Sequence, residues 1–369
     1  MVTVKAPETY LNEYGIRKEA GKYLSEYGSR IFILAGKTAW EKTGADVTAS
    51  LAARHCVPEV RIMTGYPTVE AVRQYAWEAY GAKADAVLGI GGGRVIDAAK
   101  AAGNLCGLPV AALPTIAATC ACWAARSILY DAEGSFDRIQ WNRENTRLIL
   151  ADTEILARAP RRTLASGILD SMAKWYEFEP LIAADPGDLV LRHDVTTARL
   201  TLDLLREEGP EVYRGGGTPE QWQHVTDAIF YLTGATGSFA AGKAYRGFAH
   251  SYYFSTTRIP QSRHRMHGEK VAFGLLVQFL LAGKEEAWLK DFTETLLLYD
   301  LTDVPGDWKT PDEEAMIREL SERIIREWPV VVEKKQAESA PQIAEAIREA
   351  SARLRKARAR NHENAEEGK

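Results

Sequence analysis

Short apolar runs alternate with helical stretches over roughly the first 150 residues of the chain. Five runs are strand-like, being short, rich in aliphatic residues and bounded by turn residues: residues 30–36, 59–65, 85–92, 109–115 and 147–153. Between them, residues 69–83 and 94–106 carry apolar positions at helical spacing. This alternation predicts βαβ units, in which a parallel sheet is covered by helices on both faces.

One segment of the same region has the pattern of a hairpin. Residues 127–141, SILYDAEGSFDRIQW, hold two strand-like runs around a central turn at Glu133 and Gly134. We expect this hairpin to be added to the parallel sheet.

The pattern changes beyond about residue 155, where strand signals almost vanish. Residues 164–180, 188–208 and 270–283 form long amphipathic stretches, and a charged helix is expected near the end of the chain. The step from Ala159 to Pro160 is the expected boundary. The sequence therefore predicts an α/β domain over residues 1–158 and an all-helical domain over residues 159–369.

Composition excludes several classes of function. The chain is 46% hydrophobic and 26% charged with a formal net charge of −4, which gives no footprint for a nucleic acid or an anionic membrane. It has no apolar run of transmembrane length, and its N-terminal segment lacks the regions of a signal peptide. Four cysteines do not make a disulfide framework in 369 residues. We expect a cytoplasmic protein whose partners are a small-molecule substrate and, in a homo-oligomer, copies of itself.

A glycine-rich loop joins one predicted strand to the helix that follows it. Residues 87–100, VLGIGGGRVIDAAK, place three glycines between the strand and the helix. Glycine lets backbone N–H groups approach an anion, and the start of a helix attracts negative charge. The loop predicts a phosphate cradle, although glycines at such turns also serve packing. Its spacing is neither GxGxxG nor that of a P-loop.

Three of the seven histidines lie close together: His250, His264 and His267. Imidazole is the commonest metal ligand, so a metal site is one interpretation. Ordinary surface or packing histidines are the other, and the cluster alone does not decide between them.

Four stretches in order resemble the glycerol-dehydrogenase-like branch of the iron-containing alcohol dehydrogenase superfamily. They are GGGRVIDAAK, LPTIAATCACW, ADTEILARAPRRTLASGILDSMAKWYE and AHSYYFSTTRIPQSRHRMHGEKVAFG. The resemblance spans roughly residues 5 to 300. It implies a dehydroquinate-synthase-like architecture: an α/β dinucleotide-binding domain, an all-helical metal-binding domain, and an active site in the cleft between them.

The resemblance also implies the ligands of one divalent metal, zinc or iron. Carried onto this chain, they are Asp170, His250 and His267, and His264 is expected to be a polar neighbour only. Three protein ligands leave one coordination position open, as a catalytic metal requires.

The cofactor implied by the resemblance is NADP or NAD. Its expected contacts are Gly36, Lys37, Gly91, Gly92, Gly93, Arg94, Val95, Thr115, Thr119, Arg126 and Tyr130. Relatives that prefer NAD tend to carry an aspartate where this chain has Gly36. Without that carboxylate, and with Lys37 nearby, we expect NADP(H) to be tolerated or preferred.

Two positions depart from the glycerol dehydrogenase pattern and are the expected catalytic residues. Cys120 stands where those enzymes carry an aspartate that contacts the polyol, so a negative charge is missing. Lys174 follows Asp170 by four residues, on the same helix face. Both changes favour a substrate carboxylate, and TCAxW with DxxxKWYE resembles the hydroxycarboxylate dehydrogenases of this branch. Cys120 as a packing residue and Lys174 as a salt-bridged or solvent-reaching lysine are the alternatives, and Cys122 is expected only to pack.

The resulting prediction is a metal-dependent oxidoreductase that interconverts a 2-hydroxy acid and a 2-oxo acid. A glycerol or other polyol dehydrogenase is the first alternative, weakened by Cys120. A dehydroquinate-synthase-like lyase is an alternative of another class, but it needs more basic residues than these motifs offer. A binding protein without catalysis is the least favoured, because Asp170, His250 and His267 are all present.

Overall fold

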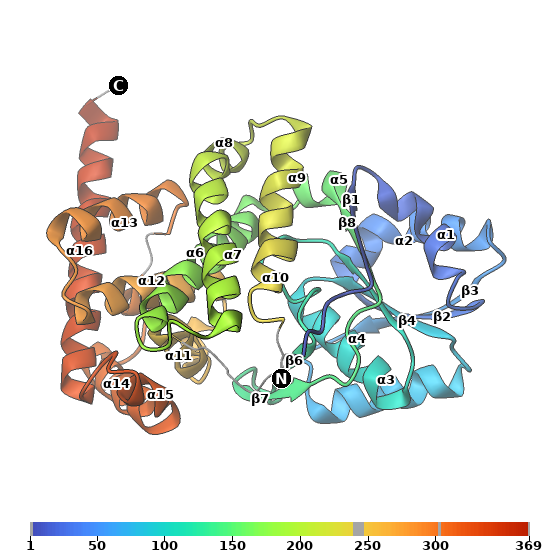
Figure 1. Ribbon diagram of the computed structural model, residues 1–369, viewed down its shortest axis with the longest axis horizontal. Helices are drawn as coiled ribbons and strands as arrows, with labels where there is room; N and C mark the ends of the chain where they lie inside the picture. Colours follow the sequence, from blue (N-terminus) through green and yellow to red (C-terminus); the bar gives the residue numbers. More distant parts are fainter. Residues whose placement is uncertain (1–2, 239–246, 302–303, 368–369) are drawn as a thin grey trace.

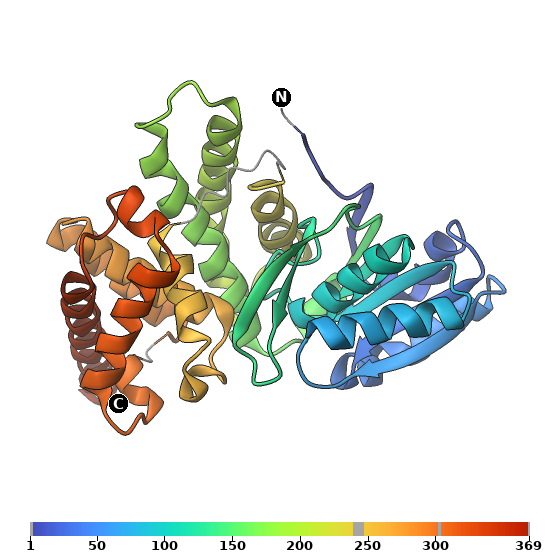
Figure 2. The same ribbon diagram turned by 90° about the horizontal axis from the view of Figure 1, so that it is seen from below.

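The computed structural model describes residues 3–238, 247–301 and 304–367. A mostly parallel α/β region occupies one side of the molecule and a helical region the other (Figures 1 and 2). Among the described helices, none combines the length and apolarity needed to cross a lipid bilayer.

A six-stranded parallel sheet forms the centre of the N-terminal region, in the order β1-β8-β5-β4-β2-β3. Its strands are β1 (Thr9–Glu13), β2 (Arg30–Gly36), β3 (Val57–Met63), β4 (Ala86–Gly91), β5 (Val110–Pro114) and β8 (Leu148–Asp152). The five strands predicted from the sequence are therefore confirmed. β1 was not predicted, because it lies at an edge with partly buried residues and has no continuous apolar run.

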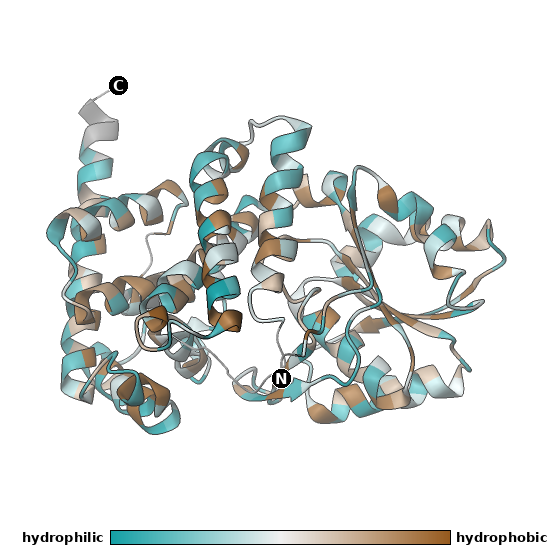
Figure 3. Cartoon of the chain, in the orientation of Figure 1, coloured by the Kyte–Doolittle hydropathy of each residue, from teal (hydrophilic) through white to brown (hydrophobic). Residues whose placement is uncertain are grey.

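Helices cover both faces of this sheet, as predicted. Side chains alternate along β2, so Ile31 and Ile33 pack against α1 (Ala20–Leu24) and α2 (Lys37–Ala52). Phe32 and Leu34 face the other way, toward α3 (Val69–Gly81) and α4 (Gly93–Cys106). Figure 3 shows hydrophobic residues concentrated in the strands between these helix layers.

The predicted hairpin is present, but its expected place in the fold was wrong. β6 (Arg126–Tyr130) and β7 (Phe136–Trp141) form a separate two-stranded antiparallel sheet instead of joining the parallel sheet. Phe136 packs against Phe254 and Trp328 of the helical region, with ring centroids 4.4 and 5.9 Å away. These contacts hold the hairpin between the two regions.

Beyond β8, the described part of the chain contains helices and no strand, as predicted. Past the short α5 (Thr153–Ala157), the helices nearest the sheet are α6 (Arg161–Ile182), α7 (Leu189–Glu207), α8 (Gly209–Arg214), α9 (Pro219–Asp227) and α10 (Thr233–Ala235), with a π-helical turn at Ala228–Leu232. The outer helices are α11 (Phe248–Thr256), α12 (His267–Leu281), α13 (Glu286–Leu298), α14 (Glu313–Glu327), α15 (Val330–Glu333) and α16 (Ala340–Glu367). Short 3-10 turns at Ile16–Glu19, Pro260–Ser262 and Pro305–Trp308 complete the described elements.

Close backbone contacts lock α6, α11 and α12 together. A Cβ on Gly268 would lie 1.9 Å from the backbone oxygen of Ser166 in α6. A Cβ on Gly274 would lie 3.0 Å from the Cα of Ala249 in α11. Glycine is needed at these crossings because any side chain would push the helices apart.

Strand β1 connects the sheet to the helical region. It pairs with β8 on the sheet side. On the helical side, the Tyr10 hydroxyl donates to Asp227 in α9 at 2.6 Å, and the Asn12 amide donates to Thr226 and Asp227 at 2.8 and 2.7 Å. This edge strand therefore ties the two regions together.

Candidate active site

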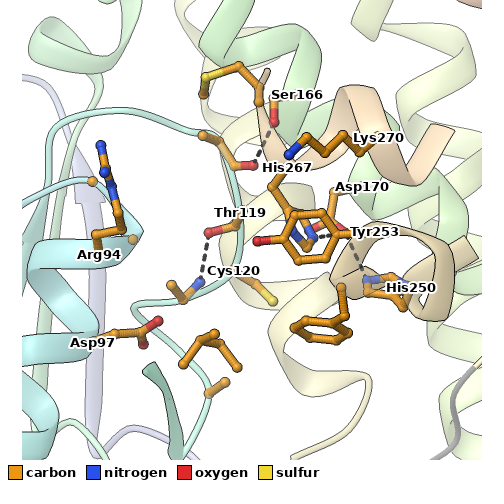
Figure 4. Close-up of a pocket in the computed structure, with 18 of the residues that line it drawn as sticks. Arg94, Asp97, Thr119, Cys120, Ser166, Asp170, His250, Tyr253, His267 and Lys270 are labelled. Carbon is orange, nitrogen blue, oxygen red and sulfur yellow. Dashed lines mark hydrogen bonds and ion pairs between the residues drawn. The ribbon is translucent and has the colours of Figure 1, made fainter. Parts of the chain in front are cut away.

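A cavity of about 690 Å³ opens between the two regions. The sheet region supplies the glycine loop, residues 116–121 and the hairpin, while α6, α11 and α12 supply the opposite wall. Figure 4 shows the two walls, with Arg94 and Asp97 on one side and His250, His267 and Lys270 on the other. The cleft expected from the family resemblance is thus present.

The glycine loop lies at the C-terminal edge of the sheet, where β4 ends and α4 begins. Gly92 is the N-cap residue of α4, and a Cβ there would lie 2.7 Å from Ile116. A Cβ on Gly93 would lie 3.2 Å from the Thr119 hydroxyl oxygen. The loop therefore presents bare backbone at the start of a 14-residue helix, which suits a phosphate.

A buried lysine shapes the segment that faces this loop. The Lys100 amine donates to the carbonyl oxygens of Ala121, Ala124 and Arg126 at 2.6, 2.9 and 2.5 Å and lies 2.9 Å from Asp97. One side chain of α4 thus holds the backbone that carries Cys120 into the cavity. Lys100 and Asp97 were not predicted from the sequence as part of the site.

Most of the predicted cofactor residues line the cavity. They are Gly92, Gly93, Arg94, Val95, Thr119, Arg126 and Tyr130. The others, Gly36, Lys37, Gly91 and Thr115, do not line it. They border the same loop: the Gly36 Cβ position is 3.5 Å from Val95, and the Thr115 N–H donates to the Gly91 carbonyl at 3.1 Å. Their contact with a nucleotide stays a prediction.

The three predicted metal ligands converge from three helices. One ligand atom from each of Asp170 (α6), His250 (α11) and His267 (α12) lies within 4.8 Å of the others. Asp170 Oδ1 is 3.3 Å from His250 Nε2 and 3.1 Å from His267 Nε2. A carboxylate with two imidazoles suits zinc or ferrous iron, so the donor set fits a divalent metal.

A buried glutamate orients one of these histidines and was missed from the sequence. Glu177 accepts from the backbone N–H of His250 at 3.0 Å and from its ring Nδ1 at 2.5 Å. A carboxylate can only accept, so Nδ1 carries the proton and Nε2 is left as the ligand atom. Spacing offered a signal, because Asp170, Lys174 and Glu177 stand at i, i+4 and i+7 on one face of α6.

Charges within this cluster shift the pKa values of its members. Burial alone would raise the pKa of Asp170, but Lys174 and His267 hold it well below its usual value. Burial works against protonation of both imidazoles. It lowers the pKa of His267. For His250, Glu177 and Asp170 together outweigh burial and raise its pKa. A carboxylate kept ionised beside a neutral His267 is the state in which metal ligands bind.

Lys174 lies beside the candidate ligands in the cavity wall. Its amine is 3.0 Å from His250 Nε2 and 3.6 Å from Asp170 Oδ1, and the residue is buried. Lys174 is therefore a salt-bridged lysine, as one alternative expected, and not one that reaches into solvent; its contact with a substrate stays a prediction.

Cys120 also lines the cavity, on the facing segment (Figure 4). Its thiol is buried, and burial raises its pKa above the usual value, so it is neutral at physiological pH. Cys122 is buried too but does not line the cavity, in keeping with a packing role.

His264 lies at the margin of the site. It lines the cavity and is exposed, and its carbonyl accepts from Arg162 at 3.1 Å. It is not part of the cluster formed by the other two histidines and Asp170.

Two further cavity residues were missed by sequence reasoning. Tyr253 packs its ring 4.1 Å from that of His267, and its hydroxyl lies 3.1 Å from that of Tyr130. Lys270, one turn after His267, is 5% exposed, and burial lowers its pKa to about 7. Its position at i+3 from a predicted ligand was the available signal.

Comparison with known proteins identifies the family. Residues 7–153 match the model of the iron-containing alcohol dehydrogenases. A glycerol dehydrogenase of Escherichia coli O6:H1 is 32% identical over 289 residues, which cover 75% of this chain and 77% of that protein. The chain belongs to the iron-containing alcohol dehydrogenase family.

Other relatives of this family member differ in the substrates that their names state. Hydroxycarboxylate dehydrogenase A of Escherichia coli K12 is 33% identical over 230 residues, covering 61% of this chain and 63% of that protein. A probable glycerol dehydrogenase of Sinorhizobium meliloti 1021 superposes with a TM-score of 0.84 at 22% identity, over 96% of this chain and 99% of that one. Members of this family use NAD(P) and a divalent metal. This chain is an oxidoreductase of the glycerol-dehydrogenase-like kind.

Proposed function

We propose that this alcohol dehydrogenase family member transfers a hydride between NADP(H) and a small 2-hydroxy acid or 2-oxo acid. The observation that carries the proposal is Lys174, whose buried amine lies 3.0 and 3.6 Å from two candidate metal ligands. A substrate whose hydroxyl or carbonyl oxygen meets the metal would bring its neighbouring carboxylate to this amine.

Cys120 supports the same class of substrate. Its buried neutral thiol contributes no negative charge to the cavity wall. A carboxylate at this position would repel an acidic substrate, whereas a neutral thiol does not.

Each site residue has a separate role in the proposed reaction. A divalent metal held by Asp170, His250 and His267 would supply a Lewis acid that polarises the substrate oxygen. Glu177 orients His250, and Lys174 neutralises the substrate carboxylate. In the direction of oxidation, the substrate hydroxyl releases a proton to solvent and its carbon gives a hydride to NADP⁺, so the products are the 2-oxo acid, NADPH and one proton.

The preference for NADP(H) rests on the end of β2. Gly36 is the N-cap residue of the 16-residue helix α2, and it is followed by exposed Lys37. A helix start beside a lysine attracts a 2′-phosphate, and Gly36 adds no carboxylate to repel one.

The Gly36→Asp variant tests this preference. The new carboxylate should repel the 2′-phosphate and accept hydrogen bonds from a free ribose hydroxyl, so the ratio of kcat/KM for NADPH to that for NADH should fall by about ten-fold or more. Gly81→Asp, at an exposed glycine that ends α3 and has no atom within 4 Å of a new Cβ, controls for added charge. An unchanged ratio would mean that Gly36 does not lie at the ribose.

Glycerol oxidation is the second candidate, and it is favoured by the 32% identity to a glycerol dehydrogenase. No relative named above is a lyase, so the comparisons give that alternative no support. A substrate panel separates the two dehydrogenase readings: 2-oxo acids and hydroxyacetone with NADPH, and 2-hydroxy acids and glycerol with NADP⁺.

The Lys174→Met variant tests the proposed contact within that panel. Removing one partner of a desolvated charge pair costs about 2–5 kcal/mol, so kcat/KM for 2-oxo acids should fall by roughly 30- to 1,000-fold or more. Hydroxyacetone, which carries no carboxylate, should lose little. Lys290→Met, at an exposed lysine of α13, is the matched control. Equal losses for both substrates, or a wild-type preference for glycerol, would overturn the proposal.

A further inference from the structure

Arg126 presents a second cation to the cavity. It is the first residue of β6, its side chain is partly buried, and it lines the cavity. Its backbone carbonyl is held by Lys100 at 2.5 Å. The backbone of Arg126 is therefore held in place by a buried lysine.

The guanidinium of Arg126 has no ion pair or hydrogen bond with any side chain or backbone group in the described parts of the chain. The nearby carboxylate, Asp97, is already paired with Lys100 at 2.9 Å. Across the cleft, the Cβ position of Gly237 is 3.9 Å from Arg126 Nη1. Among the described residues, this partly buried guanidinium lacks the hydrogen bonds that would compensate its desolvation.

Cys120 lines the same cavity as this guanidinium and Lys174. Burial dominates the raised pKa of the Cys120 thiol; Lys174, Arg126 and Lys100 oppose that rise, and Asp170 adds to it. Lys174 comes from α6 of the helical region, whereas Arg126 comes from the hairpin. Each wall of the cavity thus contributes one cation, and the residue at position 120 contributes no charge.

We propose that Arg126 binds a second anionic group on the substrate, so that the enzyme acts on dianionic 2-hydroxy and 2-oxo acids. The inference rests on the proposed function, in which Lys174 takes the carboxylate next to the reacting carbon. The planar fork of Arg126 then takes a distal carboxylate or phosphate through paired hydrogen bonds. The family resemblance counts Arg126 among the cofactor contacts, and a rise in the KM for NADPH on its removal would mark that role instead of a contact with substrate.

Pairs of 2-oxo acids of equal length test the second contact. With NADPH, 2-oxoglutarate is compared with 2-oxopentanoate, and 2-oxoadipate with 2-oxohexanoate. Phosphohydroxypyruvate compared with hydroxypyruvate tests a distal phosphate. In at least one pair, the wild type should favour the dianion by about ten-fold or more in kcat/KM. Arg126→Leu should remove that preference, mainly through the KM for the dianion, so that the ratio of kcat/KM for dianion to monoanion falls toward one.

Two further variants keep this test interpretable. Arg126→Lys retains the charge and should keep part of the preference, which also guards against a folding defect in Arg126→Leu. Arg138→Leu, on the other strand of the hairpin with a 62% exposed side chain, should change nothing. Equal rates within all three pairs would overturn the inference, as would a loss in Arg126→Leu that is equal for all substrates and accompanied by a higher KM for NADPH. The proposed function fails separately if no 2-oxo acid is reduced faster than hydroxyacetone.

Discussion

At the scale of single residues, the site depends on groups that do not themselves touch a substrate. Glu177 is the clearest, because its buried carboxylate decides which nitrogen of His250 faces Asp170. The family resemblance predicted the three candidate ligands but not Glu177. The position of Glu177 could have been predicted from its helical spacing with Asp170 in α6.

Replacing Glu177 with glutamine tests this orienting role. The amide keeps the size of the side chain but binds the imidazole less strongly and in either tautomer. We expect metal affinity to fall by about 10- to 100-fold, as is typical when such a partner is lost. A competition titration with a chromophoric chelator measures it. Glu179→Gln, at an exposed neighbour on α6, is the control, and equal affinities for all three proteins would contradict the assignment.

Lys270 should make stability depend on pH. Burial lowers its pKa from 10.5 to about 7 in the folded protein, so between these values the unfolded chain binds a proton that the folded one does not. Stability then rises with pH across this window, and the cost of the buried charge is greatest at and below pH 7.

The Lys270→Met variant removes this cost. At about 1.4 kcal/mol for each pKa unit, it should be more stable than wild type by up to several kcal/mol at pH 7. The difference should shrink as pH approaches 10. Urea unfolding at pH 7 and 9.5 measures the difference in unfolding free energy between the variant and wild type. A difference that does not vary with pH would show that the pKa of Lys270 is not lowered in the folded protein.

At the scale of elements, the strands and helices with a strong period were predictable and the irregular ones were not. The buried strands are short apolar runs, and α4, α6 and α12 follow helical spacing. β1 was missed because an edge strand needs no such run. The hairpin was recognised from its turn, but local pattern could not show that Phe136 turns toward Phe254 instead of the sheet.

The same limit applies to the candidate site. The positions of Asp170, His250 and His267 in space depend on the crossing of three helices, which spacing along the chain does not reveal. Gly268 makes one crossing possible, because α12 there touches the backbone of α6. The sequence alone does not show that Gly268, next to His267, contacts another helix.

The Gly268→Ala variant should therefore separate α6 from α12 and displace His267. Because the added methyl would lie 1.9 Å from a backbone oxygen, we expect a loss of stability, of about 1–3 kcal/mol or more, together with weaker metal binding. Gly81→Ala, at the end of α3 with no atom within 4 Å of the new Cβ, should be neutral or slightly stabilising. Equal unfolding midpoints for the two variants would contradict this account.

At the scale of the whole molecule, a metal held by three helices should stabilise the folded chain. A ligand present at 100 times its dissociation constant adds about 3 kcal/mol if it binds only the folded state. Thermal unfolding with and without a strong chelator should show this gain in wild type. His267→Ala should lose both the gain and the metal-dependent turnover, with an unchanged far-ultraviolet circular dichroism spectrum. His224→Ala, on α9 outside the cavity, should keep them. Turnover that survives in His267→Ala or in chelator would contradict the assignment.

The connection made by β1 also bears on the order in which the chain acquires its structure. Tyr10 is separated from Asp227 by 217 positions, and Asn12 from Thr226 by 214. On the ribosome, strand β1 emerges long before its partners: it can pair with β8 only after residue 152 has emerged, and its contacts with α9 wait until residue 227, when more than half of the chain has been made. An unpaired edge is prone to join a foreign strand, and the charged residues Lys5, Glu8 and Glu13 in and beside β1 discourage that outcome. The contact that joins the sheet region to the helical region thus cannot form until α9 has been synthesised.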